Sequence, residues 1–416
     1  MPKRLNNYKK ITSCRICNSK KIKIIFNFGL IPIGNDLQKN VLKSISCKKY
    51  PLKLMNCLKC NHFQLSISIN PKILYANNYT YLTGITKTFT NHFADYAKWI
   101  IKKCNLKKRS LVLDIGSNDG TCLSFFKKRK MKVLGIDPAK KPSMIANKNK
   151  IETLNQFFNK NSAEQIEKKL GKFDFITSHN VLAHTENIKE IFYSIYTLLK
   201  EDAYFCFEIG YFKEVIKHNL FDTIYHEHLD YHHASPLVNL LQKIGFSIID
   251  LSTNKIQGGT LRLLLQKRKL KIRKKVQKFI AAENKFFGKV NIKNKFKNFK
   301  KTLLKLNLQV KKEIDSNRAV YAYGSPTKAS LLLIVAKLNR NMIRNSFEDN
   351  PLKCGKYIPG SDVKIINSKK IKMSLQSGII ILAWNFSKEI EMRLKKLNMK
   401  DIKLFIPLPK LNIKKI

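Results

Sequence analysis

The sequence predicts an α/β protein with more than one domain, on three observations. The first 70 residues carry two Cys-x-x-Cys pairs among short apolar stretches that lack helical periodicity. From Ser110 to about residue 251, apolar strands alternate with helical segments, a pattern typical of a doubly wound, Rossmann-like parallel sheet. A second strand, glycine turn and helix begin at Arg318. A chain of 416 residues has room for two or three such units, each with its own core.

Shifts in composition place the domain boundaries. We expect a small N-terminal domain over 1–72, an α/β domain over 73–256 and a second α/β domain over 257–416. The strands expected in the two α/β domains begin at 110 and then cover 131–136, 173–178, 203–209, 246–251, 318–323, 342–348 and 378–383. The Lys-rich, amphipathic stretch 266–317 is expected to form a helical connector between them.

The composition narrows the class of protein. The formal charge is +52, but only 11 of the 80 basic residues are Arg, which nucleic-acid binders favour for bidentate contacts. We therefore interpret the Lys excess as a solvated surface that favours anionic small molecules over nucleic acid. The sequence contains no run of about 18 uncharged apolar residues, so it predicts no membrane-spanning helix. The first residues lack the apolar stretch of a signal peptide, so we expect a cytoplasmic protein, a monomer or weak dimer.

The two Cys-x-x-Cys pairs predict a metal site. The pairs are Cys14 with Cys17 and Cys57 with Cys60, and 39 residues lie between them. Each pair can present two thiolates to one tetrahedral Zn²⁺ ion, and four thiolates leave no open position for catalysis. The predicted zinc is therefore structural. Cys47 and His62 are further donors that could replace one of the four.

A glycine-rich turn follows the first strand of the middle domain. Gly116 and Gly120 would let a ligand approach the backbone, and Asp137 at the end of the next strand suits the two hydroxyls of a ribose. The pattern Asp-x-Gly-x-Asn-x-Gly lacks the Gly-x-Gly-x-x-Gly of dinucleotide folds, which favours S-adenosylmethionine (SAM) over NAD(P) or an empty site. The residues that we expect to bind SAM are Asp114, Gly116, Asn118, Gly120, Asp137 and Asn180.

A segment over 221–233 holds four of the nine His residues, together with Tyr225 and Glu227. Its spacing is not the His-Glu-x-x-His of a zincin helix, so we interpret it as an acid/base site, with a metal site and a structural polar cluster as alternatives. A His can act as a base near neutral pH, and a Tyr can hydrogen-bond a developing oxyanion. His184 follows the third strand, where ligand contacts are expected, although its position also suits a core residue.

The order of these motifs resembles the SAM-dependent sugar C-methyltransferases, three-domain enzymes that methylate carbon 3 of nucleotide-linked 4-keto-6-deoxysugars. The similarity runs nearly from end to end of the chain. Its motifs are the paired Cys-x-x-Cys region, 28–37, 115–121, 180–184, 221–228, 258–262, 323–328, 349–360 and 382–386. The resemblance implies a zinc-binding domain, a class I SAM methyltransferase domain and a second Rossmann-like domain.

The resemblance also implies roles for particular residues. The catalytic pocket would contain His228, Tyr225, Glu227 and His184, with either His228 or Tyr225 as the base. The base would remove the proton from carbon 3, and the enolate would attack the sulfonium methyl group. The residues implied in binding the nucleotide-linked ketosugar are Tyr79, Tyr81, Lys328 and Asn385.

Two other readings remain open at this point. A SAM-dependent methyltransferase acting on an oxygen or nitrogen of a sugar-related acceptor would need no base for a carbon-bound proton. A zinc-containing nucleic-acid-binding protein would bind in a strongly salt-dependent manner, and the scarcity of Arg counts against it. The chain departs from the family at Asp230, where Ser is usual, so the identity of the sugar stays open.

Overall fold

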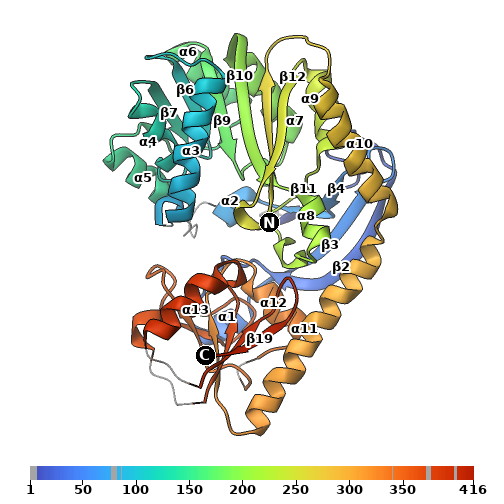
Figure 1. The fold of residues 1–416 in the computed structure, drawn as a ribbon, viewed down its shortest axis with the longest axis vertical. Coiled ribbons are helices and arrows are strands. Elements are labelled where there is room, and N and C mark those ends of the chain that lie inside the picture. The colour runs from blue at the N-terminus through green and yellow to red at the C-terminus, as the bar shows by residue number, and fades with distance from the viewer. Residues whose placement is uncertain (1–6, 76–81, 86, 340, 372–375, 398–400) are drawn as a thin grey trace, which may run out of the picture.

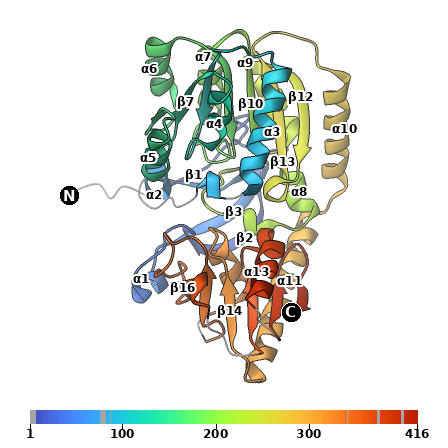
Figure 2. The ribbon, with the colours of Figure 1, turned by 60° about the vertical axis from the view of Figure 1, so that its left-hand side comes forward.

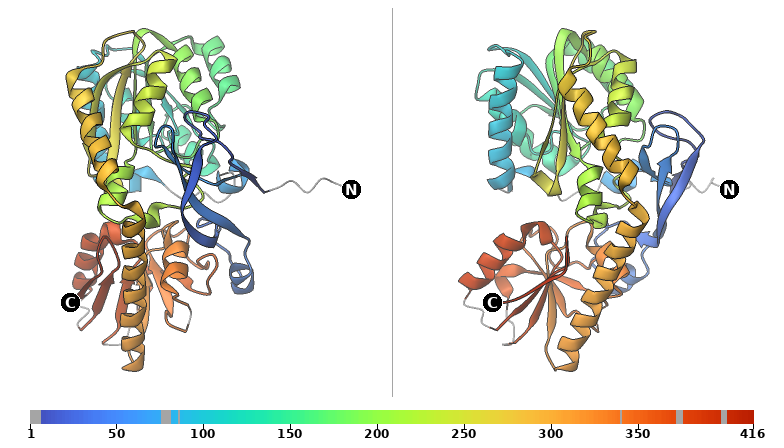
Figure 3. Two further views of the ribbon diagram at one scale, coloured as in Figure 1. Left: turned by 90° about the vertical axis from the view of Figure 1, so that its right-hand side faces the viewer. Right: turned by 45° about the vertical axis from the view of Figure 1, so that its right-hand side comes forward.

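The structure is a computed structural model that describes residues 7–75, 82–85, 87–339, 341–371, 376–397 and 401–416. Two α/β lobes lie one above the other, and the N-terminal strands run along one side of both (Figures 1 and 3). Within the described ranges, no helix combines the length and the apolar composition needed to cross a bilayer.

The N-terminal sheet is completed by a strand from the middle of the chain. Its four strands, in spatial order, are β11 (Asp230–Tyr231), β4 (Phe63–Leu65), β3 (Lys49–Cys57) and β2 (Ile22–Pro32). A separate pair joins β1 (Tyr8–Lys10) to β5 (Ile67–Ile69), and short helices form α1 (Val41–Ile45) and α2 (Pro71–Tyr75). Because β11 begins two residues after His228, the segment with the clustered histidines runs through this sheet.

The upper lobe is built on a seven-stranded sheet. In spatial order its strands are β12 (Ser247–Asn254), β13 (Thr260–Gln266), β10 (Leu199–Gly210), β9 (Phe173–His179), β6 (Leu111–Ile115), β7 (Lys132–Ile136) and β8 (Thr153–Leu154). Its helical elements are η1 (Thr83–Ile85), α3 (Lys87–Lys103), α4 (Thr121–Lys127), α5 (Lys140–Lys148), α6 (Lys160–Leu170), α7 (Ile188–Leu198), α8 (Phe212–Lys217), η2 (Phe221–Thr223), α9 (Ala234–Ile244) and η3 (Ile256–Gly258). The parallel order confirms the predicted doubly wound sheet.

The sheet extends past the boundary predicted at residue 256. Strand β13 pairs antiparallel with both β10 and β12, because the chain reverses through Gly258 and Gly259, whose φ angles are +91° and +118°. The predicted connector forms two helices, α10 (Lys274–Lys289) and α11 (Ile292–Asp315). Helix α10 runs beside the upper lobe and α11 beside the lower one (Figure 2).

The lower lobe contains a six-stranded sheet. In spatial order its strands are β16 (Lys364–Asn367), β15 (Asn345–Glu348), β14 (Val320–Tyr323), β17 (Gly378–Ile381), β18 (Lys403–Ile406) and β19 (Asn412–Lys415). Its helical elements are α12 (Ala329–Ala336), η4 (Ser368–Lys370), η5 (Trp384–Phe386) and α13 (Ser387–Lys396). Helix α12 is apolar almost all round because it is buried under the sheet. This second Rossmann-like unit confirms the predicted α/β fold class.

One apolar core joins the N-terminal sheet to both lobes. The ring of Phe26 on β2 stacks on Phe296 of α11 at 4.2 Å between centroids. The same ring meets the edge of Phe221, at the start of the histidine-rich segment, at 5.4 Å. Aromatic pairs of this kind stabilise by about 0.5–1.5 kcal/mol each beyond their buried area. The three parts therefore share packing around residue 221.

Candidate active site and metal centre

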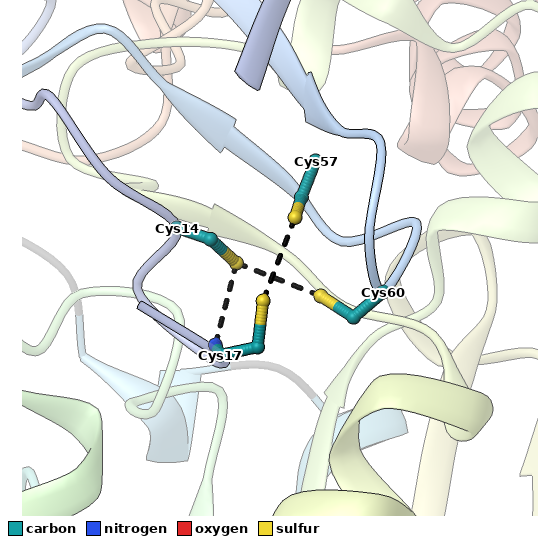
Figure 4. Close-up of side chains that lie close together, drawn as sticks. All are labelled: Cys14, Cys17, Cys57 and Cys60. Atoms are coloured by element: carbon teal, nitrogen blue, oxygen red, sulfur yellow. Dashed lines mark hydrogen bonds between the residues drawn. The ribbon is translucent and has the colours of Figure 1, made fainter. Parts of the chain in front are cut away.

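The four cysteines of the predicted metal site come together. Their sulfur atoms all lie within 4.8 Å of one another (Figure 4). The Cys14 and Cys60 sulfurs are 3.6 Å apart, as are those of Cys17 and Cys57. A tetrahedral zinc ion with Zn–S bonds of about 2.3 Å needs sulfur atoms about 3.8 Å apart, so the thiolate set fits this ion.

Both Cys-x-x-Cys pairs adopt the same backbone turn. The amide of Asn18 donates to the Cys14 carbonyl, and the amide of Asn61 donates to the Cys57 carbonyl. The two Asn residues have φ angles of +61° and +60°, a region that Asn tolerates better than most residues. The Asn after each pair is a local signal that could have strengthened the prediction. His62 is engaged elsewhere, with Asp230, and is not part of the cluster.

A cavity of about 1600 Å³ lies between the lobes. Residues from the N-terminal domain and from both lobes line it, and they include Asn35, Asp114, His228 and Trp384. The carboxyl ends of β6, β7 and β9 open into one side of the cavity, as expected for a ligand crevice of a doubly wound sheet.

Two buried carboxyl groups define the methyl-donor side of the cavity. Asp114 Oδ1 is buried and has no hydrogen-bond partner among the described residues. Burial, and then the nearby charge of Asp137, raise the pKa of Asp114 well above its usual range. Asp137 accepts hydrogen bonds from the backbone amides of Asn118 at 2.9 Å and Ala139 at 2.8 Å, one on each carboxylate oxygen. Each oxygen can accept a further hydrogen bond from a ligand. The pair suits a ligand with a cationic amino group and a ribose, such as SAM.

The two glycines of the turn have different neighbours. Gly116 lines the cavity at φ +74°, and a Cβ there would lie 2.1 Å from the Val181 Cγ2 atom. Gly120 is not among the lining residues. It precedes α4 at φ +76°, where a Cβ would press on Ile151 at 3.0 Å and Ala146 at 3.2 Å. Gly120 therefore serves the turn and its packing, because α5 and the loop after it lie against it.

A short segment before α3 covers the turn. The amide of Thr83 donates to Asn118 Oδ1 at 3.0 Å, and the amide of Gly84 donates to Asp119 Oδ2 at 2.8 Å. Both Thr83 and Asn118 line the cavity, as does Asn180 after β9. Sequence reasoning missed Thr83 and Gly84, because nothing local indicates that residues 35 positions apart would bond. The predicted residues Tyr79 and Tyr81 lie outside the described residues.

The predicted catalytic residues face one another. The Tyr225 hydroxyl lies 2.9 Å from His228 Nε2, and His228 Nδ1 lies 3.0 Å from the Thr223 carbonyl oxygen. A carbonyl can only accept, so Nδ1 carries the proton and Nε2 of the neutral ring accepts the Tyr225 O–H. Burial, followed by the proximity of His184, lowers the pKa of His228 to about 3. The imidazole is thus neutral near pH 7 and holds a lone pair toward Tyr225.

Glu227 and His184 complete this group. His184 Nδ1 lies 2.7 Å from the Glu227 carbonyl oxygen, and its ring lies edge-on to His228 at 4.8 Å between centroids. Glu227 Oε1 accepts from Asn35 Nδ2 at 2.8 Å. Burial raises the pKa of Glu227 to about 8, so this carboxyl is largely protonated at pH 7. Burial also lowers the pKa of His184 to about 4.

Lys328, which the resemblance implied in binding the nucleotide-linked ketosugar, is held by three partners within the protein. Its ammonium lies 3.0 Å from Asp222 Oδ2, 2.9 Å from Asn385 Oδ1 and 3.8 Å from the centre of the Trp384 ring. Trp384 Nε1 also donates to Asp222, at 2.6 Å. Both predicted residues line the cavity, but the charge of Lys328 is already balanced by a buried carboxylate.

A second buried cluster under the cavity was missing from the sequence prediction. Glu208 on β10 lies 2.7 Å from His92 Nε2 and 3.2 Å from His179 Nδ1, and it pairs with Arg262 at 2.6 Å. Arg262 in turn lies over the ring of Tyr96. His179 lines the cavity, so this cluster fixes one wall of it. Its members come from four separate elements, and no spacing in the sequence announces such a group.

Comparison with known proteins assigns all three parts of the chain. Residues 14–75 match the profile of a zinc binding domain, residues 90–251 that of a methyltransferase domain, and residues 255–409 that of a C-methyltransferase C-terminal domain. The C-methyltransferase NovU of Streptomyces niveus is 26% identical over 405 residues, which cover 96% of both chains.

Two solved methyltransferase structures cover less than half of this chain. The magnesium protoporphyrin IX methyltransferase of Synechocystis PCC 6803 with bound SAM is 17% identical, with a TM-score of 0.34 over 43% of this chain and 79% of that one. A SAM-dependent methyltransferase from Clostridium acetobutylicum is 13% identical, with a TM-score of 0.34 over 43% of this chain and 92% of that one.

Proposed function

Because the chain belongs to the three-domain SAM-dependent C-methyltransferases, we propose that it methylates carbon 3 of a nucleotide-linked 4-keto-deoxysugar. The observation that carries this proposal is that one cavity is lined by the neutral Tyr225–His228 pair, a protonated Glu227 and the buried Asp114. A neutral base next to a neutral acid suits proton abstraction beside a carbonyl group, where an enolate must be formed and stabilised.

The Tyr225–His228 pair is the proposed base. A 4-keto group acidifies the hydrogen on carbon 3, and the only unprotonated nitrogen of His228 is directed at the Tyr225 hydroxyl. The proton can go to Nε2 directly, or to the Tyr225 oxygen while the proton of Tyr225 moves to Nε2. In both routes His228 ends as imidazolium, with its charge next to the new enolate.

Glu227 is the proposed stabiliser of the enolate. A protonated carboxyl group can donate a hydrogen bond to the 4-keto oxygen as negative charge develops there. Asn35 holds one carboxyl oxygen, which orients the group. His184, packed against His228, limits the movement of the ring that takes the proton.

The remaining walls hold the two substrates. SAM, when bound, supplies an electrophilic methyl group. Asp114 and Asp137 are the proposed partners of its amino group and ribose hydroxyls. On the lower lobe, Arg393 is the better candidate than Lys328 for the diphosphate, because its side chain lines the cavity and is 43% exposed, although it contacts Asp349.

The test is solvent deuterium incorporation at carbon 3 of a nucleotide-linked 4-ketosugar, with S-adenosylhomocysteine present and SAM absent. We expect enzyme-dependent exchange, slower by roughly 10²–10⁴-fold in His228→Gln, the usual contribution of a general base. His218→Gln is the matched control, since the His218 ring is exposed on the surface and lies 3.1 Å from the carboxylate of Glu214.

The outcomes separate the alternatives. Exchange that is lost in His228→Gln and kept in His218→Gln would support carbon methylation. A larger loss in Tyr225→Phe than in His228→Gln would assign the direct contact with substrate to Tyr225. Confirmed SAM binding without exchange in any of several ketosugars would contradict the proposal and favour an oxygen or nitrogen acceptor.

A further inference from the structure

The catalytic segment is anchored to the zinc-binding domain two residues after His228. Strand β11 pairs with β4, placing Asp230 opposite Gln64. The amide of Leu65 on β4 also donates to the Leu229 carbonyl at 2.9 Å. Because β4 begins three residues after Cys60, the same short stretch of chain carries half of the cysteine cluster and one side of this anchor.

Arg15, between the first two cysteines, reaches both histidine-bearing segments. Its Nε lies 2.9 and 3.0 Å from the two oxygens of Asp230, and its Nη2 donates to the carbonyl of Thr185. Thr185 directly follows His184. The Arg15 backbone amide is itself held by Gln64 Oε1 at 2.8 Å. The guanidinium is a rigid fork, so it fixes the distance between its two partners as a flexible ammonium could not.

The two segments are also tied to each other. The amide of Leu229 donates to the Ala183 carbonyl at 2.7 Å, next to the contact between His184 and the Glu227 carbonyl. A displacement of Thr185 or Asp230 would therefore shift His184 against His228, whose rings are in contact.

The ion pair is isolated from solvent. The Asp230 side chain is fully buried and that of Arg15 is 9% exposed. His62, two residues after Cys60, gives Asp230 a third contact at 2.9 Å. Removing either charge would leave the other buried and poorly compensated. The paired conformation of Arg15 and Asp230 is therefore strongly favoured over conformations in which the two side chains are apart.

We propose that Arg15 and Asp230 are positioning residues that make the His184–His228 geometry depend on the turn formed by the first Cys-x-x-Cys pair, Cys14 to Asn18, which we call the first knuckle. The inference rests on the proposed function and deepens it. The metal centre would then set the alignment of the acid/base group as well as the stability of its own domain. Neither residue touches the reacting atoms, and each acts through the backbone next to a catalytic histidine.

The test compares Arg15→Met with Lys189→Met. Lys189 on α7 also connects the first knuckle to the upper lobe, because its ammonium donates to Asn18 Oδ1 at 2.6 Å. Unlike Arg15, it does not contact a residue next to His184 or His228. For both variants and the wild type we would measure carbon-3 exchange, SAM affinity by calorimetry, zinc content and the ¹⁵N signals of the His184 and His228 rings. Those signals are assigned through single substitutions.

In Arg15→Met we expect exchange to fall by up to about 100-fold, the effect of an ångström-scale misplacement. SAM affinity should stay within about twofold and the zinc content should be unchanged. The ring signals should show that the single neutral tautomer of His228 is lost. Lys189→Met should match the wild type in each measurement. Wild-type exchange and ring signals in Arg15→Met, or equal losses in both variants, would overturn the proposal.

Two further arms keep the result decisive. If Arg15→Met does not fold, Arg15→Lys retains the charge but not the fork, and its exchange should still fall several-fold; wild-type exchange in that variant would contradict the positioning role. If the wild type exchanges no ketosugar, the proposed function fails separately. The ring signals then decide alone: a change in the Arg15 variant but not in Lys189→Met supports the positioning role, and any other pattern refutes it.

Discussion

Replacing Glu227 by Gln tests whether the carboxyl group acts as a hydrogen-bond donor. A carboxyl group can donate only while it is protonated, so its contribution should depend on pH. The carboxyl is buried, and burial raises its pKa to about 8. A Gln amide has nearly the same shape and can donate a hydrogen bond at every pH. The wild type should therefore lose activity as the pH rises through the pKa of Glu227, whereas Glu227→Gln should not.

The size of the effect follows from that pKa. With a pKa of about 8, about 90% of Glu227 is protonated at pH 7 and about 10% at pH 9, so the rate should fall roughly tenfold between them. The acidic side is set by His228 and His184, whose pKa values are lowered to about 3 and about 4. Both imidazoles stay neutral down to about pH 5, so the rate should be flat from pH 5 to 7.

The assay is carbon-3 deuterium exchange in the presence of S-adenosylhomocysteine, from pH 5 to 9.5, with the background rate without enzyme subtracted at each pH. Glu227→Gln should be slower than the wild type at pH 7, because an amide donates less strongly than a carboxyl group, but its profile should stay level above pH 8. The same decline above pH 8 in both proteins would refute the assignment to Glu227. A rate that already falls between pH 7 and 5 would contradict the neutral histidines.

Three further variants test the other parts of the site. Cys14→Ser should reduce bound zinc from about one equivalent to a small fraction, measured by emission spectrometry; Cys47→Ser, which changes a cysteine outside the cluster, should not. Asp114→Asn should weaken SAM binding by about 1.5–3 kcal/mol in calorimetry, the value of a hydrogen bond to a charged group, and unchanged affinity would refute its role. Lys328→Met should lower the free energy of unfolding in urea by about 3 kcal/mol, because it leaves Asp222 buried without its cation; adding Asp222→Asn should recover part of that loss.

The sequence predicts those features of the site that depend on local pattern. The cysteine pairs and the turn after β6 are each contained within a few residues, and the carboxyl ends of parallel strands must meet at one edge of the sheet. Gly120 shows the limit of this reasoning, because a turn glycine kept for its φ angle looks the same in sequence as one that faces a ligand.

Contacts between distant residues could not be predicted. Lys328 follows a strand and a glycine turn that the sequence shows, but its partner Asp222 lies more than 100 residues earlier in the chain. The Arg15–Asp230 pair spans 215 residues. The return of β13 into the upper sheet, beyond residue 256, could not be predicted either, because periodicity marks strands but does not say that the next strand returns antiparallel into the same sheet.

The chemistry of this site depends on closure from several sides. Three acidic residues of segment 221–231 are held by other parts of the chain. Lys328 of the lower lobe pairs with Asp222. In the N-terminal domain, Asn35 donates to Glu227 and Arg15 pairs with Asp230. Neither lobe alone could exclude water from these groups, because partners come from each side of the segment. Separating the parts would rehydrate Glu227 and return its pKa toward 4.5, turning the acid into a carboxylate that repels an enolate. The contacts that assemble the domains therefore also set the protonation state of Glu227 on which the proposed mechanism depends.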